Sequence, residues 1–335
     1  MIALLVAAAL VPGTAQGALI LEDASGLRAF LTAASAYAPS LSPREVGLSL
    51  RAMVGVDLLD EQPEWGLAHH GARVLAVSRD AVGLSAPLRD AKSARVALAA
   101  WRDARRGRAG TVARGRLFTA SGRGAPAMLK GLLHSQQLPK QLLAAARGPL
   151  VWTARLDEPL RAAVLAVDAS AQGLVARGIL IASAPLLAAP APAGCDGAPT
   201  ACLRAGLGPA GRGAIALALA QLRMPPQEGL MRASRAALRI DAVDARRLEA
   251  LVPAAAFDGP ATSGPALSGL VDLSKLDAAL AKLTPLDVLS GEWAAAAYAA
   301  HLLYGPLLRN AGPLTLTGDP LPKNTARIEL RLPLH

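Results

Sequence analysis

The hydrophobic pattern predicts short strands gathered in runs, with amphipathic helices between the runs. Apolar and polar positions alternate over residues 327–332 and again over residues 233–241, which is typical of strands with one buried and one wet face. Less regular apolar runs predict further strands at 72–78, 83–88, 112–120, 150–156, 161–168, 173–182 and 213–222.

Apolar residues spaced three and four apart predict helices at 25–34, 43–54 and 274–283, and a further helix that carries Ala94, Leu98 and Trp101. Two of these helices begin with capping boxes, Ser42 with Glu45 and Ser274 with Asp277. Residues 244–252 and 292–304 also predict helices. The second of these is almost wholly apolar, so we expect it to be buried.

The order of these elements favours the α+β class, with mostly antiparallel sheets packed by amphipathic helices. A soft boundary at Gly148-Pro149 divides the chain into an N-terminal half, 18–149, and a C-terminal half, 150–335. Both halves have helices, meandering strands and further helices, so two similar halves are one interpretation. A Pro/Gly-rich excursion at 185–212 interrupts the second half.

Residues 1–17 have the layout of a secretory signal peptide. An apolar run is followed by Pro12-Gly13 and by small residues, with cleavage expected before Ala18. The run is about half of the roughly 20 residues that a membrane span needs, so we do not expect this chain to be an integral membrane protein. The alternatives are a buried N-terminal helix and a misassigned start codon. The interpretation that we carry forward is export to the periplasm or beyond the cell.

The only two cysteines agree with export. Cys195 and Cys202 flank a short segment with Gly, Pro, Asp and Thr, which favours a tight bend. We expect a disulfide that closes this loop. The alternative, a redox or metal pair, lacks Cys-x-x-Cys spacing and a nearby histidine.

The formal net charge of +10 raises the question of an anionic partner. Few aromatic residues accompany the densest basic stretch, which disfavours nucleic acid. A solvated helix end is one reading of this stretch. The other is contact with an anionic lipid, lipopolysaccharide or cell-wall polymer. The residues of this predicted basic patch are Arg102, Arg105, Arg106, Arg108, Arg114 and Arg116.

The most polar neighbourhood combines carboxylates with imidazoles, the groups that an acid/base or metal site requires. Its spacing fits no metal motif, so a solvated loop is the first interpretation and a hydrolase site the second. The residues of this predicted polar cluster are Asp57, Asp60, Glu61, Glu64, His69 and His70.

Other motifs do not raise the expectation of an enzyme. Gly206, Gly208 and Gly211 match Gly-x-Gly-x-x-Gly, but no strand-like run precedes them, so we expect a loop. Ser85 is followed by Pro87 where a nucleophile elbow needs glycine. We therefore expect no cofactor, no metal and no catalytic residue.

The segments Gly55-Val56-Asp57-Leu58-Leu59 and Trp65-Gly66-Leu67, in this order of elements, resemble an exported bacterial envelope family of uncharacterised function. The resemblance implies an envelope location and no activity. Three hypotheses follow. The first is a non-enzymatic binding or scaffolding protein that contacts another envelope component. The second is a carrier or chaperone for a lipid or other apolar ligand, and the third is a hydrolase that uses the polar cluster.

Overall fold

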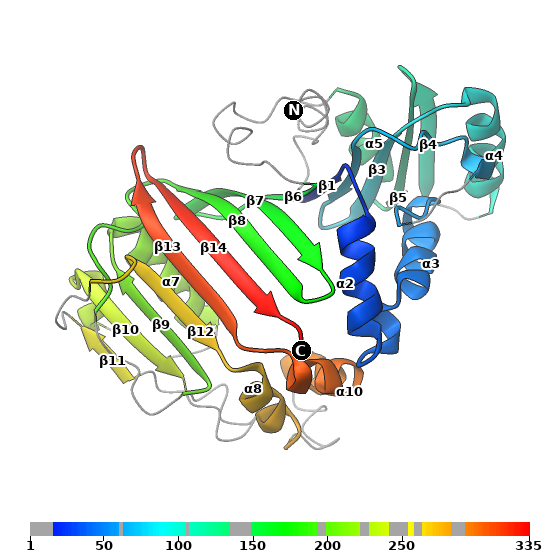
Figure 1. Ribbon diagram of the computed structural model, residues 1–335. Helices are drawn as coiled ribbons and strands as arrows, with labels where there is room; N and C mark the ends of the chain where they lie inside the picture. Colours follow the sequence, from blue (N-terminus) through cyan, green and yellow to red (C-terminus); the bar gives the residue numbers. More distant parts are fainter. Residues whose placement is uncertain are drawn as a thin grey trace. The chain divides into compact units, whose positions relative to one another are not determined.

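The computed structural model confirms the α+β class, with strands paired antiparallel (Figure 1). It describes residues 16–59, 63–104, 107–134, 149–192, 199–221, 228–240, 254–257, 263–282 and 292–335. Among these residues, no helix has the length and apolar character that crossing a membrane requires.

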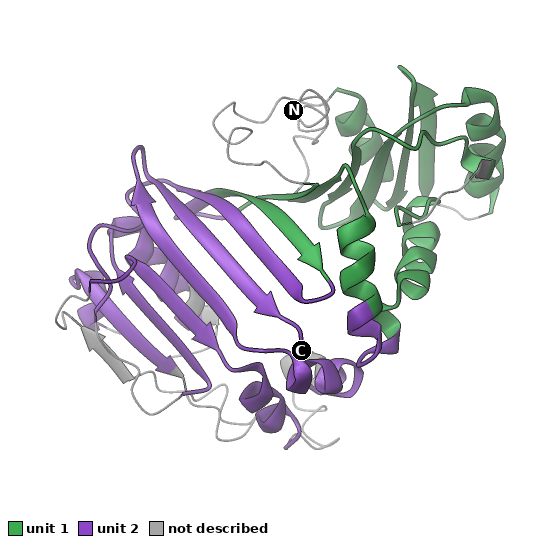
Figure 2. Cartoon of the chain, in the orientation of Figure 1, with its two compact units in different colours: residues 1–32, 40–156, 162–170 green, residues 33–39, 157–161, 171–335 purple. Residues whose placement is uncertain are grey.

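The chain forms two compact units (Figure 2). The first comprises residues 1–32, 40–156 and 162–170, and the second comprises 33–39, 157–161 and 171–335. The predicted boundary at 149 and 150 lies inside the first unit. The reason is the strand that begins at Leu150, since it pairs along its length with the strand that begins at Gly17.

The first unit has strands in the order β7-β6-β1-β2-β3-β5-β4. Their bounds are β1 Gly17–Leu21, β2 Arg73–Val77, β3 Ala81–Pro87, β4 Arg108–Ala113, β5 Arg116–Gly122, β6 Leu150–Arg155 and β7 Leu160–Ser170. The helices are α2 Ser25–Ser35, α3 Pro43–Val54, α4 Ala91–Asp103 and α5 Ala125–Leu133. Short 3₁₀ turns occur at Pro39–Leu41 and Pro63–Trp65.

The second unit has strands in the order β11-β10-β9-β12-β13-β14-β8. Their bounds are β8 Gly173–Ala182, β9 Ala201–Gly206, β10 Arg235–Ile240, β11 Ala254–Phe257, β12 Leu267–Val271, β13 Leu314–Leu321 and β14 Thr325–Pro333. The helices are α7 Pro209–Gln221, α8 Leu273–Leu280 and α10 Glu292–Asn310, and a 3₁₀ turn occurs at Glu228–Met231.

The two units share one arrangement of elements. In the first, β1 is followed by α2 and α3 and then by the β2–β3 hairpin. In the second, β12 is followed by α8 and α10 and then by the β13–β14 hairpin. In each case the first strand pairs with the nearer strand of the hairpin. The shared run lies at the start of the first unit and at the end of the second, so the interpretation of two similar halves stays a prediction.

Side-chain caps explain where several helices begin. Ser42 Oγ accepts a hydrogen bond from Glu45 N at 3.2 Å, so the predicted start of α3 is confirmed. The predicted capping box of α8 is wrong. The cap is Asp272, whose Oδ1 accepts from Lys275 N at 3.1 Å, and Asp277 has another role, described below.

Three further elements differ from their predictions. Residues 112–120 contain a β4–β5 hairpin, because Arg114 and Gly115 adopt left-handed φ angles of 51° and 68° and turn the chain. Residues 209–221 form α7 where a strand was predicted. In α10, Leu302 and Leu303 are 61% and 53% exposed, so this helix is not wholly buried. The predicted helix at 244–252 lies outside the described residues.

Candidate anion-binding face

One face of the second unit's sheet is apolar and the other is polar. Ala236 and Leu238 of β10, Leu267 of β12 and Ile328 of β14 are buried on the first face. Helix α7 lies behind the sheet in the view of Figure 1, and no described helix of this unit lies in front of its central strands. Because side chains alternate along a strand, the residues between these apolar positions lie on the opposite, wetter face.

Strand register places the polar residues in two rows across the sheet. The first row runs across β9, β12, β13, β14 and β8, and the second lies two residues further along the same strands. We call the two rows together the Arg204 face: Arg204, Ser268, Thr317, Glu329 and Arg177 in the first row, and Cys202, Leu270, Thr315, Arg331 and Val175 in the second.

A hollow of about 800 Å³ lies on this face and at its border with α8. Arginines contribute from two strands, hydroxyls from β12 and β13, and a lysine from the first turn of α8. The basic and hydroxyl-bearing residues of this lining are Arg204, Ser268, Thr315, Thr317, Arg331 and Lys275. Its volume is within the range of small-molecule sites, and its lining mixes basic and hydroxyl groups with apolar surface from Pro199, Leu270 and Pro313.

Arg204 is half-buried, and its Nη2 donates a hydrogen bond to Ser268 Oγ at 3.1 Å. Within the described part of the chain, no carboxylate pairs with Arg204. A guanidinium on a sheet surface is usually solvated or paired with an anion. Arg204 is therefore the best-placed cation of the hollow to receive an external anion.

Arg331 is held differently, through Glu329. Glu329 Oε2 accepts from Arg177 Nε at 2.6 Å, and its Oε1 accepts from Arg331 Nε. These side-chain hydrogen bonds, from Arg177 first and Arg331 second, lower the pKa of Glu329 below its ordinary value. The carboxylate stays ionised and offsets part of the positive charge beside the hollow.

Lys275 reaches the hollow from α8. Its Nζ lies 3.6 Å from Asp272 Oδ2, and Asp272 also accepts from the hydroxyl of Ser274. Partial burial acts to raise the pKa of Asp272, but the hydrogen bonds from Ser274 and Lys275 outweigh it, so the pKa is lowered. The ionised cap thus fixes the helix start that carries Lys275.

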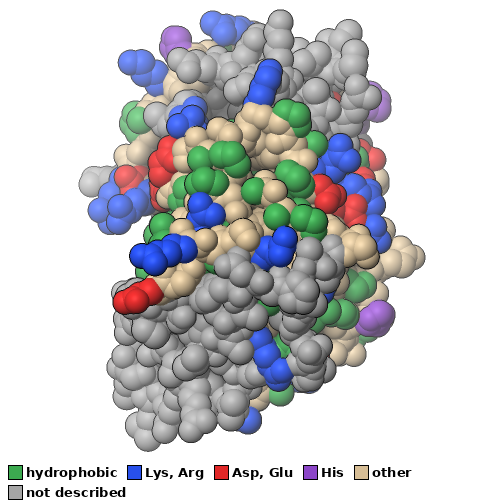
Figure 3. Space-filling view, turned by 90° about the vertical axis from the view of Figure 1, so that its left-hand side faces the viewer, with side chains coloured by type: hydrophobic (Ala, Val, Ile, Leu, Met, Phe, Trp, Pro, Cys, Tyr) green, Lys and Arg blue, Asp and Glu red, His purple; other side chains and the backbone are tan. Residues whose placement is uncertain are grey.

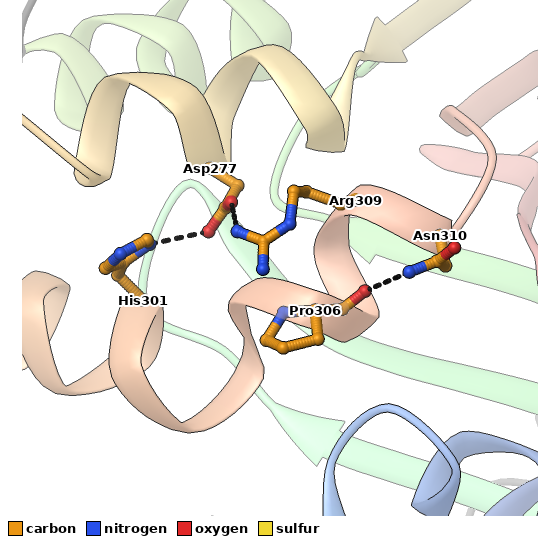
Figure 4. A network of polar contacts seen from close by, with 5 residues as sticks. All are labelled: Asp277, His301, Pro306, Arg309 and Asn310. Carbon is orange, nitrogen blue, oxygen red and sulfur yellow. Dashed lines mark hydrogen bonds and ion pairs between the residues drawn. The ribbon is translucent and has the colours of Figure 1, made fainter.

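A buried carboxylate ties α8 to α10. Asp277 is 1% exposed; its Oδ1 lies 2.8 Å from His301 Nδ1 and its Oδ2 lies 2.6 Å from Arg309 Nη1 (Figure 4). Gly305 leaves the space for this arrangement, since a Cβ there would lie 2.8 Å from Asp277 Oδ1. We call Asp277, His301 and Arg309 the Asp277 cluster. No local pattern in the sequence predicts this cluster, because His301 and Arg309 lie 24 and 32 positions from Asp277.

The first unit has a smaller hollow of about 410 Å³, lined by Arg28, Arg44, Arg51 and Asp57 among others. Asp57 is 8% exposed, its Oδ1 accepts from Leu59 N at 2.8 Å, and its Oδ2 occupies the space that a side chain at Gly47 would need. The backbone contact and the close packing give Asp57 a structural role.

The predicted polar cluster forms no described metal site. Glu64 and both histidines are exposed, and His69 Nε2 lies 3.3 Å from Arg89 Nη1. Asp60 and Glu61 lie outside the described residues. In the described part of the chain, no group of three His, Cys, Asp or Glu side chains is arranged to hold a metal ion.

Three arginines of the predicted basic patch bond to the protein itself. Arg108 stacks on Trp101 at 4.8 Å and donates to Trp101 O at 2.8 Å. Arg114 donates to Leu133 O at 3.3 Å, and Arg116 donates to Ala72 O at 2.7 Å and to Ser85 Oγ at 2.8 Å. Arg102 is exposed, and Arg105 and Arg106 lie outside the described residues. Basic side chains also occur elsewhere, some beside acidic ones (Figure 3).

The Gly-x-Gly-x-x-Gly segment does follow a strand and open a helix, contrary to the sequence prediction. Gly206 ends β9 and α7 begins at Pro209. The chain itself fills the space at these glycines: Cβ atoms at Gly206 and Gly208 would lie 1.8 Å from Ala189 O and 2.0 Å from Pro185 O. Carbonyl oxygens also accept from Gly208 N and Ala210 N, so these amides do not face a phosphate. The glycines serve close backbone packing.

Two other predictions fall partly outside the described residues. Cys202 lies in β9 and carries no free thiol, because it is disulfide-bonded. Cys195 is not among the described residues, so the pairing stays a prediction. Residues 1–15 are also outside them, and β1 begins at Gly17, one residue before the predicted new N-terminus.

Comparison with known proteins adds no further assignment. No protein family, no curated protein and no solved structure matches this chain. The resemblance to an exported envelope family stays a prediction, and the functional argument rests on the residues themselves.

Proposed function

We propose that this is an exported, non-enzymatic protein that binds an anionic component of the cell envelope through the Arg204 face. The observation that carries the proposal is Arg204, a half-buried guanidinium that lines a hollow of about 800 Å³ and has a hydroxyl as its partner. Guanidinium groups bind carboxylates and phosphates with paired, charge-assisted hydrogen bonds. The net charge of +10 favours encounter with such a partner.

The lining of the hollow favours this function over the carrier for an apolar ligand. An apolar guest would have to strip water from Arg204, Arg331 and Lys275 without replacing their hydrogen bonds, which costs free energy. The hydrolase hypothesis has less support still, because Asp57 packs against Gly47 while His69 faces Arg89. Binding is the chemistry that the described side chains support best.

A binding measurement tests the anion site. The protein without its predicted signal peptide would be titrated with dextran sulfate, polyphosphate and polygalacturonate. Each titration would be done at low salt and again at about 0.15 M salt. We expect Arg204→Ala to weaken binding to at least one polyanion more than Arg123→Ala does. Arg123 is an exposed arginine of the first unit, so its replacement by alanine removes the same charge at a different place. Equal losses in the two variants, or no binding by any polyanion, would contradict the proposal.

Mass spectrometry of protein from its native cell tests export. We expect a periplasmic or secreted species that begins at Ala18 and is two hydrogens lighter than the fully reduced chain. Reduction and alkylation should then label Cys195 and Cys202 together. A chain that retains Met1 and stays in the cytosolic fraction would contradict the location.

A further inference from the structure

We infer that the hollow of the Arg204 face takes an acidic saccharide, a chain of sugars that carry carboxylate or phosphate groups. This inference rests on the proposed function and adds the class of ligand. Its basis is the order of groups across the sheet: a guanidinium, then hydroxyls on two strands, then a second guanidinium.

The spacing of the two arginines suits a ligand of more than one unit. Arg204 is on β9 and Arg331 is on β14, with β12 and β13 between them. Three strand spacings correspond to roughly 14 Å. This is a separation between backbones, and a short chain with repeated acidic groups can contact both arginines without either side chain crossing the strands between them.

The strands between the arginines carry the groups that sugars use. Thr315 and Thr317 of β13 and Ser268 of β12 line the floor of the hollow. A hydroxyl both donates and accepts hydrogen bonds, so it pairs well with another hydroxyl. Since Ser268 Oγ accepts from Arg204, its proton remains to be donated to a ligand. A polyanion without hydroxyl groups has no protons to donate, so it would use the hydroxyls of this floor only as donors.

The remaining lining also fits a sugar better than a nucleic acid. Leu270 is 38% exposed in the second row and offers an apolar surface to the C–H face of a sugar ring. Single-stranded nucleic acids are held mainly by base stacking on aromatic rings. Among the described residues that line this hollow there is no Trp, Tyr or Phe.

Positive charge is concentrated at the hollow's edges, where the acidic groups would lie. Arg204 is at one side, Arg331 at the other, and Lys275 at the start of α8. Asp272 and Glu329 each hold one of these cations in place and reduce the local charge. The site is therefore moderately basic with a polar floor, which favours recognition of a ligand with spaced charges over a dense polyanion.

The test compares four probes on the full-length processed protein by titration calorimetry at about 0.15 M salt. They are oligogalacturonate, dextran phosphate, neutral dextran and polyphosphate. We expect one or both acidic saccharides to bind about tenfold more tightly than polyphosphate, and neutral dextran not to bind. Binding of oligogalacturonate alone would identify carboxylates as the acidic groups, and binding of dextran phosphate alone would identify phosphates.

Variants separate charge from hydroxyl recognition. Arg204→Ala should weaken saccharide binding about tenfold, as the loss of a charge-assisted contact implies. The paired change Thr315→Val and Thr317→Val keeps shape and charge, so it should weaken saccharide binding, which uses these hydroxyls as donors and acceptors, more than polyphosphate binding, which uses them as donors only. Circular dichroism and thermal unfolding would confirm that each variant is folded.

The outcomes distinguish this inference from the proposed function. If polyphosphate binds as tightly as the saccharides and the threonine variant changes nothing, the saccharide inference fails while anion binding stands. If no probe binds, or if Arg204→Ala binds every probe as the unaltered protein does, both fail.

Discussion

Asp277 and His301 lie on different helices, and Oδ1 of Asp277 is 2.8 Å from Nδ1 of His301. Because an ionised carboxylate only accepts hydrogen bonds, the proton of this contact resides on Nδ1 of the imidazole. Arg309 completes the partners of Asp277, whose side chain is buried. The cluster thus joins α8, which carries Lys275 to the hollow, to α10.

We expect His301→Ala to destabilise the protein by about 1.5–3 kcal/mol, the value of a hydrogen bond to a charged group. The change leaves one oxygen of a buried carboxylate without its partner. His134→Ala is the matched control, since His134 is an exposed histidine whose ring bonds to Lys130 O within its own helix. Urea unfolding would compare the two. Equal effects would mean that the Asp277 contact contributes no stability.

Gly305, which lies beside the Asp277 cluster, allows us to predict whether a Gly→Ala change raises or lowers stability. In an exposed helix, Gly→Ala stabilises by roughly 1 kcal/mol. At Gly305 the new Cβ would lie 2.8 Å from Asp277 Oδ1 and 3.3 Å from His301 Nδ1. We therefore expect Gly305→Ala to destabilise the protein, and Gly47→Ala to do the same because Asp57 occupies its space. A rise in melting temperature for either variant would show that the carboxylate moves aside without cost.

Local patterns predicted the fold better than they predicted the site. Alternation identified β10 and β14, and the Ser42 capping box identified the start of α3, because each depends on neighbours in the chain. Helix α7 was predicted as a strand, because its apolar residues are so evenly spread that neither period dominates.

The chemistry of single residues was harder to predict because it depends on distant partners. Asp277 looked like a capping residue, yet it bonds to side chains 24 and 32 positions away. Arg204 gave no signal in the sequence at all. Its place became apparent only when strand register put it beside Ser268, 64 positions later. The alternation of Arg327, Glu329 and Arg331 was the one local sign of the polar face.

Arg116 shows why a run of arginines in sequence was a poor guide to a basic surface. Burial lowers its pKa to about 10, and its guanidinium donates to Ala72 O and Ser85 Oγ. We expect Arg116→Met to destabilise the protein by about 1–3 kcal/mol for each acceptor left without a donor.

Arg102→Met is the control for this change, since Arg102 is an exposed member of the same predicted patch. Its effect should stay within about 0.5 kcal/mol, as for most surface substitutions. The measurement is chemical unfolding monitored by circular dichroism. Two variants of equal stability would mean that the contacts of Arg116 are replaced by water without loss.

The proposed site predicts that Glu329 affects both acid stability and ligand binding, and the sign of both effects follows from its partners. Hydrogen bonds from Arg177 and Arg331 lower its pKa below the ordinary value of 4.5. A carboxylate with a lowered pKa in the folded state contributes stability that is fully present above pH 4.5. That contribution is lost as the pH falls through the lower, folded-state pKa.

We expect Glu329→Gln to reduce stability at pH 7 by about 0.5 kcal/mol, since the partners are partly exposed. Below pH 4.5 the difference from the unaltered protein should shrink progressively, and it should vanish once the pH is below the folded-state pKa, where the native glutamate is protonated too. The same change frees Arg331 and Arg177 from a carboxylate, so acidic saccharides should bind more tightly at pH 7. Urea unfolding at pH 7 and pH 3, together with the titrations described above, checks both effects. A constant difference in stability at the two pH values would refute the ion pairs, and unchanged affinity would show that Arg331 does not contact the ligand.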